Sequence, residues 1–132
     1  FRAEAKHPRH DLALAVEGGV IVRDPKFGPL LMFGLGGIFV EVMKDVVFRI
    51  PPITDVEAAE MVRGIRGYPI LAGARGGPRA DEAFLAEAIL RLSQMATDLP
   101  EIEQVDINPL IAGPERAASF VVDARVRRGE GA

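Results

Sequence analysis

The clearest fold signal lies in residues 81–111, DEAFLAEAILRLSQMATDLPEIEQVDINPLI. From Phe84 to Met95, apolar residues recur at steps of three and four, which is the spacing of a helix with one apolar face. We therefore predict a helix that begins at Asp81. Strand-like runs follow it at residues 102–107 and 110–111. This stretch thus predicts a helix that packs against a sheet.

More strands are predicted ahead of this helix. They are short runs of apolar and alternating residues between glycines, prolines and charged turns, and they cover residues 20–22, 30–33, 38–43 and 46–50. The connection 23–29 contains two prolines and a glycine, which is typical of a hairpin. These residues therefore predict an antiparallel group of strands.

A second helix is predicted after these strands. Thr54 and Glu57 have the spacing of a capping box, in which each side chain accepts a hydrogen bond from the other residue's backbone N–H. We expect this helix to end near Gly67 and to have an apolar face of Val56, Met61 and Ile65. A loop over residues 71–79 is expected to lead to the next helix.

After both helices the chain returns to strands, with a last strand predicted at 119–126 behind a turn at 113–116. This order predicts the α+β class, with a mainly antiparallel sheet and two helices packed on one face. The other face is then free to bind a ligand. We divide the chain into an irregular segment 1–19, one domain over 20–128 and a tail at 129–132.

Composition narrows the function classes. The 132 residues are 48% hydrophobic and 27% charged, with a net charge of -3, which is typical of one globular domain. The chain has no cysteine, so disulfides and thiol chemistry are excluded. Arginines alternate with acidic residues, so we expect no nucleic-acid partner.

The longest uncharged stretch, 27–40, is too short to span a membrane, and the charged amino end has no signal-peptide core. We therefore expect a cytoplasmic protein that does not bind membranes.

A candidate metal site lies at the end of the strand 102–107. Residues two apart in a strand point to the same face, so Asp106 and Asn108 are predicted to project together. If the turn at 113–116 closes a hairpin, Asp123 lies on the neighbouring strand beside them. Two carboxylates and an amide oxygen are ligands that suit Mg2+. The alternative is that these residues face solvent and that Asn-Pro is only a turn.

Two other segments are weaker candidates for binding anions. Gly36 and Gly37 belong to a glycine string whose backbone N–H groups could approach an anion, although a tight turn between strands is the simpler explanation of the string. Arg75 precedes two glycines near a helix amino end, where it is either a phosphate clamp or a solvated loop residue. For Asp45 and Arg49, the simplest interpretation is an ion pair.

Several groups of residues, taken together and in this order, resemble one family, the ATP-grasp module of NDP-forming acyl-CoA synthetases. This family includes the β subunit of ADP-forming acetyl-CoA synthetase and is related to the succinyl-CoA synthetase β subunit. The groups are Arg23-Asp24-Pro25 with Phe27-Gly28-Pro29, Met32-Phe33-Gly34-Leu35-Gly36-Gly37 with Val40-Glu41-Val42, Asp45-Val46 with Arg49, Gly73 with Arg75-Gly76, and Asp106-Ile107-Asn108-Pro109-Leu110 with Asp123-Ala124-Arg125.

The resemblance implies a function and a set of site residues. Members of the family are similar in making acyl-CoA, NDP and phosphate from a carboxylic acid, CoA and a nucleoside triphosphate through a phosphohistidine. The implied cofactors are ATP and Mg2+. The implied metal ligands are Asn108 and Asp123, and Asp106 is implied to face the metal or the phosphohistidine. The two residues with an implied catalytic role are Asp106 and Arg75.

Nucleotide contacts are implied for Gly36, Gly37 and Glu41. The domain over 20–128 resembles the carboxy-terminal ATP-grasp subdomain, and no counterpart of the amino-terminal subdomain, with its phosphate-binding lysine, precedes residue 20. The implied partners are therefore ATP or ADP, that amino-terminal subdomain and a CoA-ligase α part in the same or a separate chain.

The isolated chain is expected to be inactive and to have an exposed sheet face through which copies could self-associate. The alternative function is a regulatory or assembly module, like the synthetase-like region of some protein acetyltransferases. The sequence leaves open which acid is used and whether the nucleotide is ATP or GTP.

Overall fold

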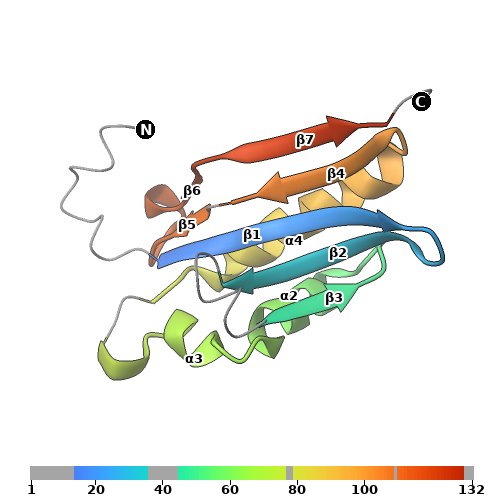
Figure 1. Cartoon of the computed structure of the whole chain (residues 1–132). Helices are drawn as coiled ribbons and strands as arrows, with labels where there is room; N and C mark the ends of the chain where they lie inside the picture. Colours follow the sequence, from blue (N-terminus) through green and yellow to red (C-terminus); the bar gives the residue numbers. More distant parts are fainter. Residues whose placement is uncertain (1–13, 36–44, 77–78, 109, 130–132) are drawn as a thin grey trace.

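The structure is a computed structural model that describes residues 14–35, 45–76, 79–108 and 110–129. Within these residues, every strand pairing is antiparallel, and the strand order is β3-β2-β1-β4-β7, with β5 paired to β1 and β6 (Figure 1). The strands are β1 (Leu14–Asp24), β2 (Gly28–Leu35), β3 (Val46–Arg49), β4 (Ile102–Ile107), β5 (Leu110–Ala112), β6 (Phe120–Val121) and β7 (Ala124–Arg128).

The two long helices, α2 and α4, lie on one side of this sheet and cover the same face (Figure 1). The helical segments of the described residues are α2 (Asp55–Gly64), α3 (Tyr68–Leu71), η3 (Ala74–Gly76), α4 (Glu82–Asp98) and η4 (Arg116–Ala118). The predicted α+β class, with a mainly antiparallel sheet and two main helices on one face, is confirmed. None of the helices in the described part of the chain is long and apolar enough to span a membrane.

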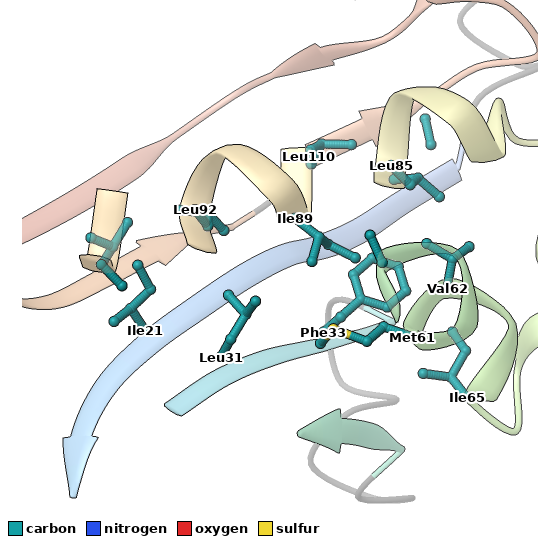
Figure 2. Packing of buried hydrophobic residues seen from close by; sticks show 14 of the residues in the cluster. Ile21, Leu31, Phe33, Met61, Val62, Ile65, Leu85, Ile89, Leu92 and Leu110 are labelled. Atoms are coloured by element: carbon teal, nitrogen blue, oxygen red, sulfur yellow. The ribbon is translucent and has the colours of Figure 1, made fainter. Parts of the chain in front are cut away.

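The hydrophobic core fills the space between the sheet and these two helices (Figure 2). Ile21 in β1 stands opposite Leu31 in β2 and Val105 in β4, so one row of buried side chains crosses three strands. Phe33 of β2 and Met61 of α2 are also at most 1% exposed. Burying one such side chain contributes roughly 1.5–3 kcal/mol, so this row holds the helices and the sheet together.

Both helix starts are confirmed because their signals are local. Thr54 caps α2, and its hydroxyl accepts the Glu57 N–H while the Glu57 carboxylate accepts the Thr54 N–H, which completes the capping box. Asp81 caps α4 by accepting the Phe84 N–H at 3.2 Å. The predicted apolar face of α2 is wrong at Val56, which is 62% exposed.

Three predicted boundaries differ from the structure. The segment 1–19 was expected to be irregular, but β1 begins at Leu14. The register of β1 against β2 shifts between Glu17 and Val20, so the two intervening glycines lie at an irregularity inside the strand rather than before it. The predicted loop 71–79 contains the end of α3 and all of η3, and the predicted strand 119–126 is divided into β6 and β7. The predicted strand 38–43 lies outside the described residues.

Candidate metal centre

The carboxyl end of β4 and the start of β7 bring the three predicted metal ligands together. Asp106 stands opposite Arg125, and Ile107 stands opposite Ala124. One residue further on, the Asn108 N–H donates to the Asp123 carbonyl oxygen at 3.0 Å. Directly opposed residues of an antiparallel pair share a face, and so do residues two apart in one strand. By this register, Asp106, Asn108 and Asp123 are on one face of the sheet; that they form a metal site stays a prediction.

This face is the one turned away from the helices, because Ile107 packs against the core on the other side. Asn108 is exposed, and the Asp123 side chain is 55% exposed. Asp106 is half-buried, and its Oδ1 atom is buried without a hydrogen-bond partner among the described residues. An unpaired buried carboxylate oxygen is costly unless it gains a cation or a donor.

The residues present fit a hard divalent cation. They offer only oxygen ligands, and Asp106 contributes one oxygen that lacks any other partner. Among the described residues, no three Asp, Glu, His or Cys side chains are grouped so that they could hold a metal ion by themselves. A site at this face therefore needs the Asn108 amide oxygen and ligands from outside the chain, such as phosphate oxygens or water.

Arg125 also belongs to this site, although in the sequence it was identified only as part of a motif and had no predicted role. Its Nε lies 3.9 Å from Asp123 Oδ2, and its backbone is opposite Asp106. Arg125 and Asp106 line a hollow of about 240 Å³ together with Gln104, Val126 and Arg127. The alternation of Asp123, Arg125 and Arg127 along one strand was a visible signal, but only the register places that row beside Asp106.

The structure does not bring Arg75 to this group by any described contact. Its backbone belongs to η3, and its side chain lies outside what the structure describes. The segment that carries it is anchored on both sides, since Leu71 is fully buried and the Ala80 N–H donates to the Leu71 carbonyl at 2.8 Å. Predicted nucleotide contacts at Gly36, Gly37 and Glu41 lie outside the described residues.

Asp45 does not form the expected ion pair with Arg49. Its carboxylate instead accepts the backbone N–H groups of Arg66 and Gly67, at 2.6 and 2.8 Å. Arg49 donates to the carbonyl oxygen of Phe48, its own neighbour. No sequence pattern predicts this long-range contact, because the partners of the carboxylate are backbone amides of a turn that follows α2.

Tyr68, at the start of α3, is bound by the carboxylate of Glu82. Its hydroxyl donates to Glu82 Oε2 at 2.7 Å, and Arg63 Nε donates to Glu82 Oε1 at 3.1 Å. The hydrogen bond to Glu82 raises the pKa of Tyr68 above its ordinary value, and the same carboxylate raises the pKa of Arg63. Glu82 therefore links α2, α3 and α4 in the described structure.

A family model described as an ATP-grasp domain matches residues 9–127. The chain belongs to the ATP-grasp family. Among curated relatives, the β subunit of ADP-forming acetate–CoA ligase I from Pyrococcus furiosus is 53% identical over 106 residues, which are 80% of this chain and 45% of that protein. The ADP-forming 4-hydroxybutyrate–CoA ligase of Nitrosopumilus maritimus is 42% identical over 103 residues, which are 78% of this chain and 15% of that protein.

A solved structure of the dinucleotide-forming acetyl-coenzyme A synthetase 1 of Candidatus Korarchaeum cryptofilum is similar to this chain, with a TM-score of 0.80 and 37% identity. The match covers 87% of this chain and 53% of that one. That structure is of a complex with coenzyme A and Mg-AMPPCP, in which the phosphohistidine segment points towards the nucleotide-binding site. Our chain spans less than half the length of the curated relatives described above.

Proposed function

We propose that this chain is the Mg-nucleotide-facing part of an ADP-forming acyl-CoA synthetase, which makes acyl-CoA, ADP and phosphate from a carboxylic acid, CoA and ATP through a phosphohistidine. The observation that carries the proposal is the register that places Asp106, Asn108 and Asp123 on one open face, with the buried Oδ1 of Asp106 unpaired among the described residues. Relatives named as ADP-forming acid–CoA ligases support it.

In this proposal, Asp106, Asn108 and Asp123 would hold Mg2+ through their side-chain oxygens, together with ligands from the nucleotide or water. Bound there, the ion would supply neutralisation of phosphate charge and orientation of the group to be transferred. Arg125 supplies a guanidinium next to Asp123 that can bind a phosphate oxygen in the hollow beside Asp106. Arg75 is proposed to contact phosphate as well.

The proposal also includes partners that this chain does not contain. Phosphoryl transfer depends on positioning the nucleotide from both sides, so an amino-terminal ATP-grasp subdomain is needed to complete the site, with proposed nucleotide contacts from Gly36, Gly37 and Glu41. A CoA-ligase α part, in the same or a separate chain, would carry the phosphohistidine. We further propose that the isolated chain is inactive, that it can self-associate, and that the protein is cytoplasmic.

The test uses the full-length protein that contains this chain. Incubated with ATP, Mg2+, CoA and a panel of short carboxylic acids, it should produce acyl-CoA and ADP in equal amounts. Asn108→Ala combined with Asp123→Ala should abolish this production without unfolding the protein. The matched control is Asp98→Asn, which changes an exposed carboxylate at the end of α4 and should leave the production of acyl-CoA and ADP unchanged. Release of AMP, or full activity of the double variant, would contradict the proposal.

A further inference from the structure

Asp45 is a buried carboxylate to which the proposed function assigns no role. Its residue is only 3% exposed, and it lies directly before β3. Its two oxygens accept different backbone N–H groups, Oδ1 from Arg66 at 2.6 Å and Oδ2 from Gly67 at 2.8 Å. In the part of the chain that the structure describes, it has no cationic partner. The two short hydrogen bonds therefore offset the cost of burying this charge.

The backbone of Asp45 is fixed from the other side by β2. Gly34 pairs with Val46, the residue after Asp45. A Cβ atom on Gly34 would lie 2.5 Å from the Asp45 carbonyl oxygen and 2.8 Å from a methyl group of Val46. Only glycine allows β2 to approach this closely. The Asp45 side chain therefore extends from a rigid strand pair to the turn that follows α2.

The amides that Asp45 binds mark the start of the segment that carries Arg75. Gly67 is the residue before α3, and η3 follows α3 after two residues. The far end of the segment is tied to the body by the Asp81 N–H, which donates to the Gly113 carbonyl oxygen at 2.7 Å. Gly113 directly follows β5, the short strand that comes after β4 in the chain, and β5 lies at the same end of the sheet as the carboxyl end of β4 (Figure 1).

We propose that Asp45 is a positioning residue, which fixes the start of segment 66–76 so that Arg75 is presented at the site end of the sheet. The catalytic consequence rests on the proposed function, whereas the structural tie does not. A carboxylate suits this role because it offers an acceptor to each of two successive N–H groups. Asparagine keeps only one acceptor oxygen in the same shape, so it should hold the segment less firmly.

Asp24 provides a matched control for the same chemistry elsewhere. Its Oδ1 accepts the N–H groups of Lys26 and Phe27, at 2.7 and 3.1 Å, in the turn between β1 and β2. That turn lies at the end of the sheet opposite to α3 (Figure 1). Replacing either aspartate removes an acceptor from two backbone amides, but only Asp45 acts on the segment with Arg75.

The first measurement is amide hydrogen exchange by mass spectrometry in the full-length protein. In Asp45→Ala, exchange over residues 66–76 should become faster by about tenfold or more, with Asp45→Asn intermediate, while exchange over residues 24–28 stays at the wild-type rate. Asp24→Ala should give the reverse pattern. Unchanged exchange over 66–76, or equally faster exchange throughout the protein, would overturn the proposal. If Asp45→Ala does not fold, Asp45→Asn decides alone by the same criteria.

The second measurement is acyl-CoA formation by the same variants. Asp45→Ala should lower kcat by about tenfold or more with little change in the KM for ATP, because a misplaced arginine weakens interactions made in the transition state. Asp24→Ala should keep the wild-type kcat. A loosened segment with an unchanged kcat would overturn the positioning role. If the wild-type protein makes no acyl-CoA, the proposed function fails, and the exchange data still decide whether Asp45 fixes the segment.

Discussion

Asp106 shows at the scale of one residue how a binding site differs from a packed core. Its Oδ1 is buried and unpaired among the described residues, although a carboxylate is expensive to desolvate. Residues that serve a ligand are often unfavourable for stability until the ligand binds. The period of two along β4 was enough to predict that Asp106 and Asn108 share a face. It could not predict Arg125, because that requires the register of β7 against β4.

We expect Asp106→Asn to leave the free energy of unfolding of the metal-free chain unchanged or to raise it by up to about 1 kcal/mol, because a neutral amide is cheaper to bury without a partner. Urea denaturation in the absence of divalent cations measures this. The control is Val105→Ala on the same strand. Because Val105 is only 1% exposed, this substitution should lower the free energy of unfolding by about 1–3 kcal/mol. A loss of that size for Asp106→Asn would contradict our interpretation of the unpaired oxygen.

Glu87 gives a prediction for acid stability. Hydrogen bonds from Arg116 and then Arg91 lower the pKa of Glu87 from 4.5 to about 2. A carboxylate with a lowered pKa in the folded state adds stability above its unfolded pKa, and this contribution is lost as the pH falls from about 4.5 towards 2. The stability gap between wild type and Glu87→Gln should therefore be present at pH 6 and shrink below pH 4.5.

Denaturant titrations of both proteins at pH 6 and pH 3 test this expectation. The Glu87 side chain is 34% exposed, so the gap should be small and should decrease further in high salt. A gap that grows on acidification would show that Glu87 is not held in its charged form by these arginines.

At the scale of elements, local signals predicted helix starts well and strand limits poorly. Caps depend on residues three apart, so Thr54 and Asp81 could be identified from sequence. The start of β1 could not, because Gly18 and Gly19 resemble a turn and become part of a strand only through pairing with β2 and β4. In α2, Val56 was assigned to the core although it lies about 140° around the helix from Met61.

The end of α4 depends on a contact that sequence does not reveal. Arg23 of β1 donates through Nε to the Ile102 carbonyl at 2.7 Å, and through Nη2 to the carbonyls of Ala96 and Leu99 at 3.3 and 3.4 Å. A cation near the carbonyl end of a helix is favourable, and the planar guanidinium reaches three acceptors at once. Arg23 therefore ties α4 to β1 and β4.

We expect Arg23→Met to lower the free energy of unfolding by about 1–3 kcal/mol, because the carbonyls lose a charged donor while the apolar stem is kept. Arg23→Lys should recover only part of this, since a lysine cannot reproduce the branched geometry. Thermal and urea denaturation provide the measurement. Arg128→Met, on the exposed strand β7, is the control and should change stability by less than about 0.5 kcal/mol. Equal effects of Arg23→Met and Arg128→Met would exclude the tie.

At the scale of the whole molecule, one row of residues crosses the open face of the sheet. In register from β3 to β7, it contains Phe48, Met32, Val20, Asp106 and Arg125. The β3 end is apolar, with Phe48 half exposed, and the β7 end is charged. This division suits a face that contacts a further subdomain on one side and a metal nucleotide on the other.

The order of strands and helices predicted the α+β class, because each element had its own periodicity. The role of the open face could not come from periodicity, because in the proposed function that face is completed by residues outside this chain. The resemblance of ordered motifs, whose family the ATP-grasp match over residues 9–127 shows, is what led to the proposal of a second subdomain.

The central claim is that Asp106, Asn108 and Asp123 hold the metal that binds the nucleotide. The most direct test is calorimetric titration of ATP into the full-length protein, with and without Mg2+. In the wild type, Mg2+ should strengthen ATP binding by at least about tenfold, whereas in Asn108→Ala combined with Asp123→Ala the two affinities should be nearly equal. The same strengthening by Mg2+ in the double variant would contradict the claim.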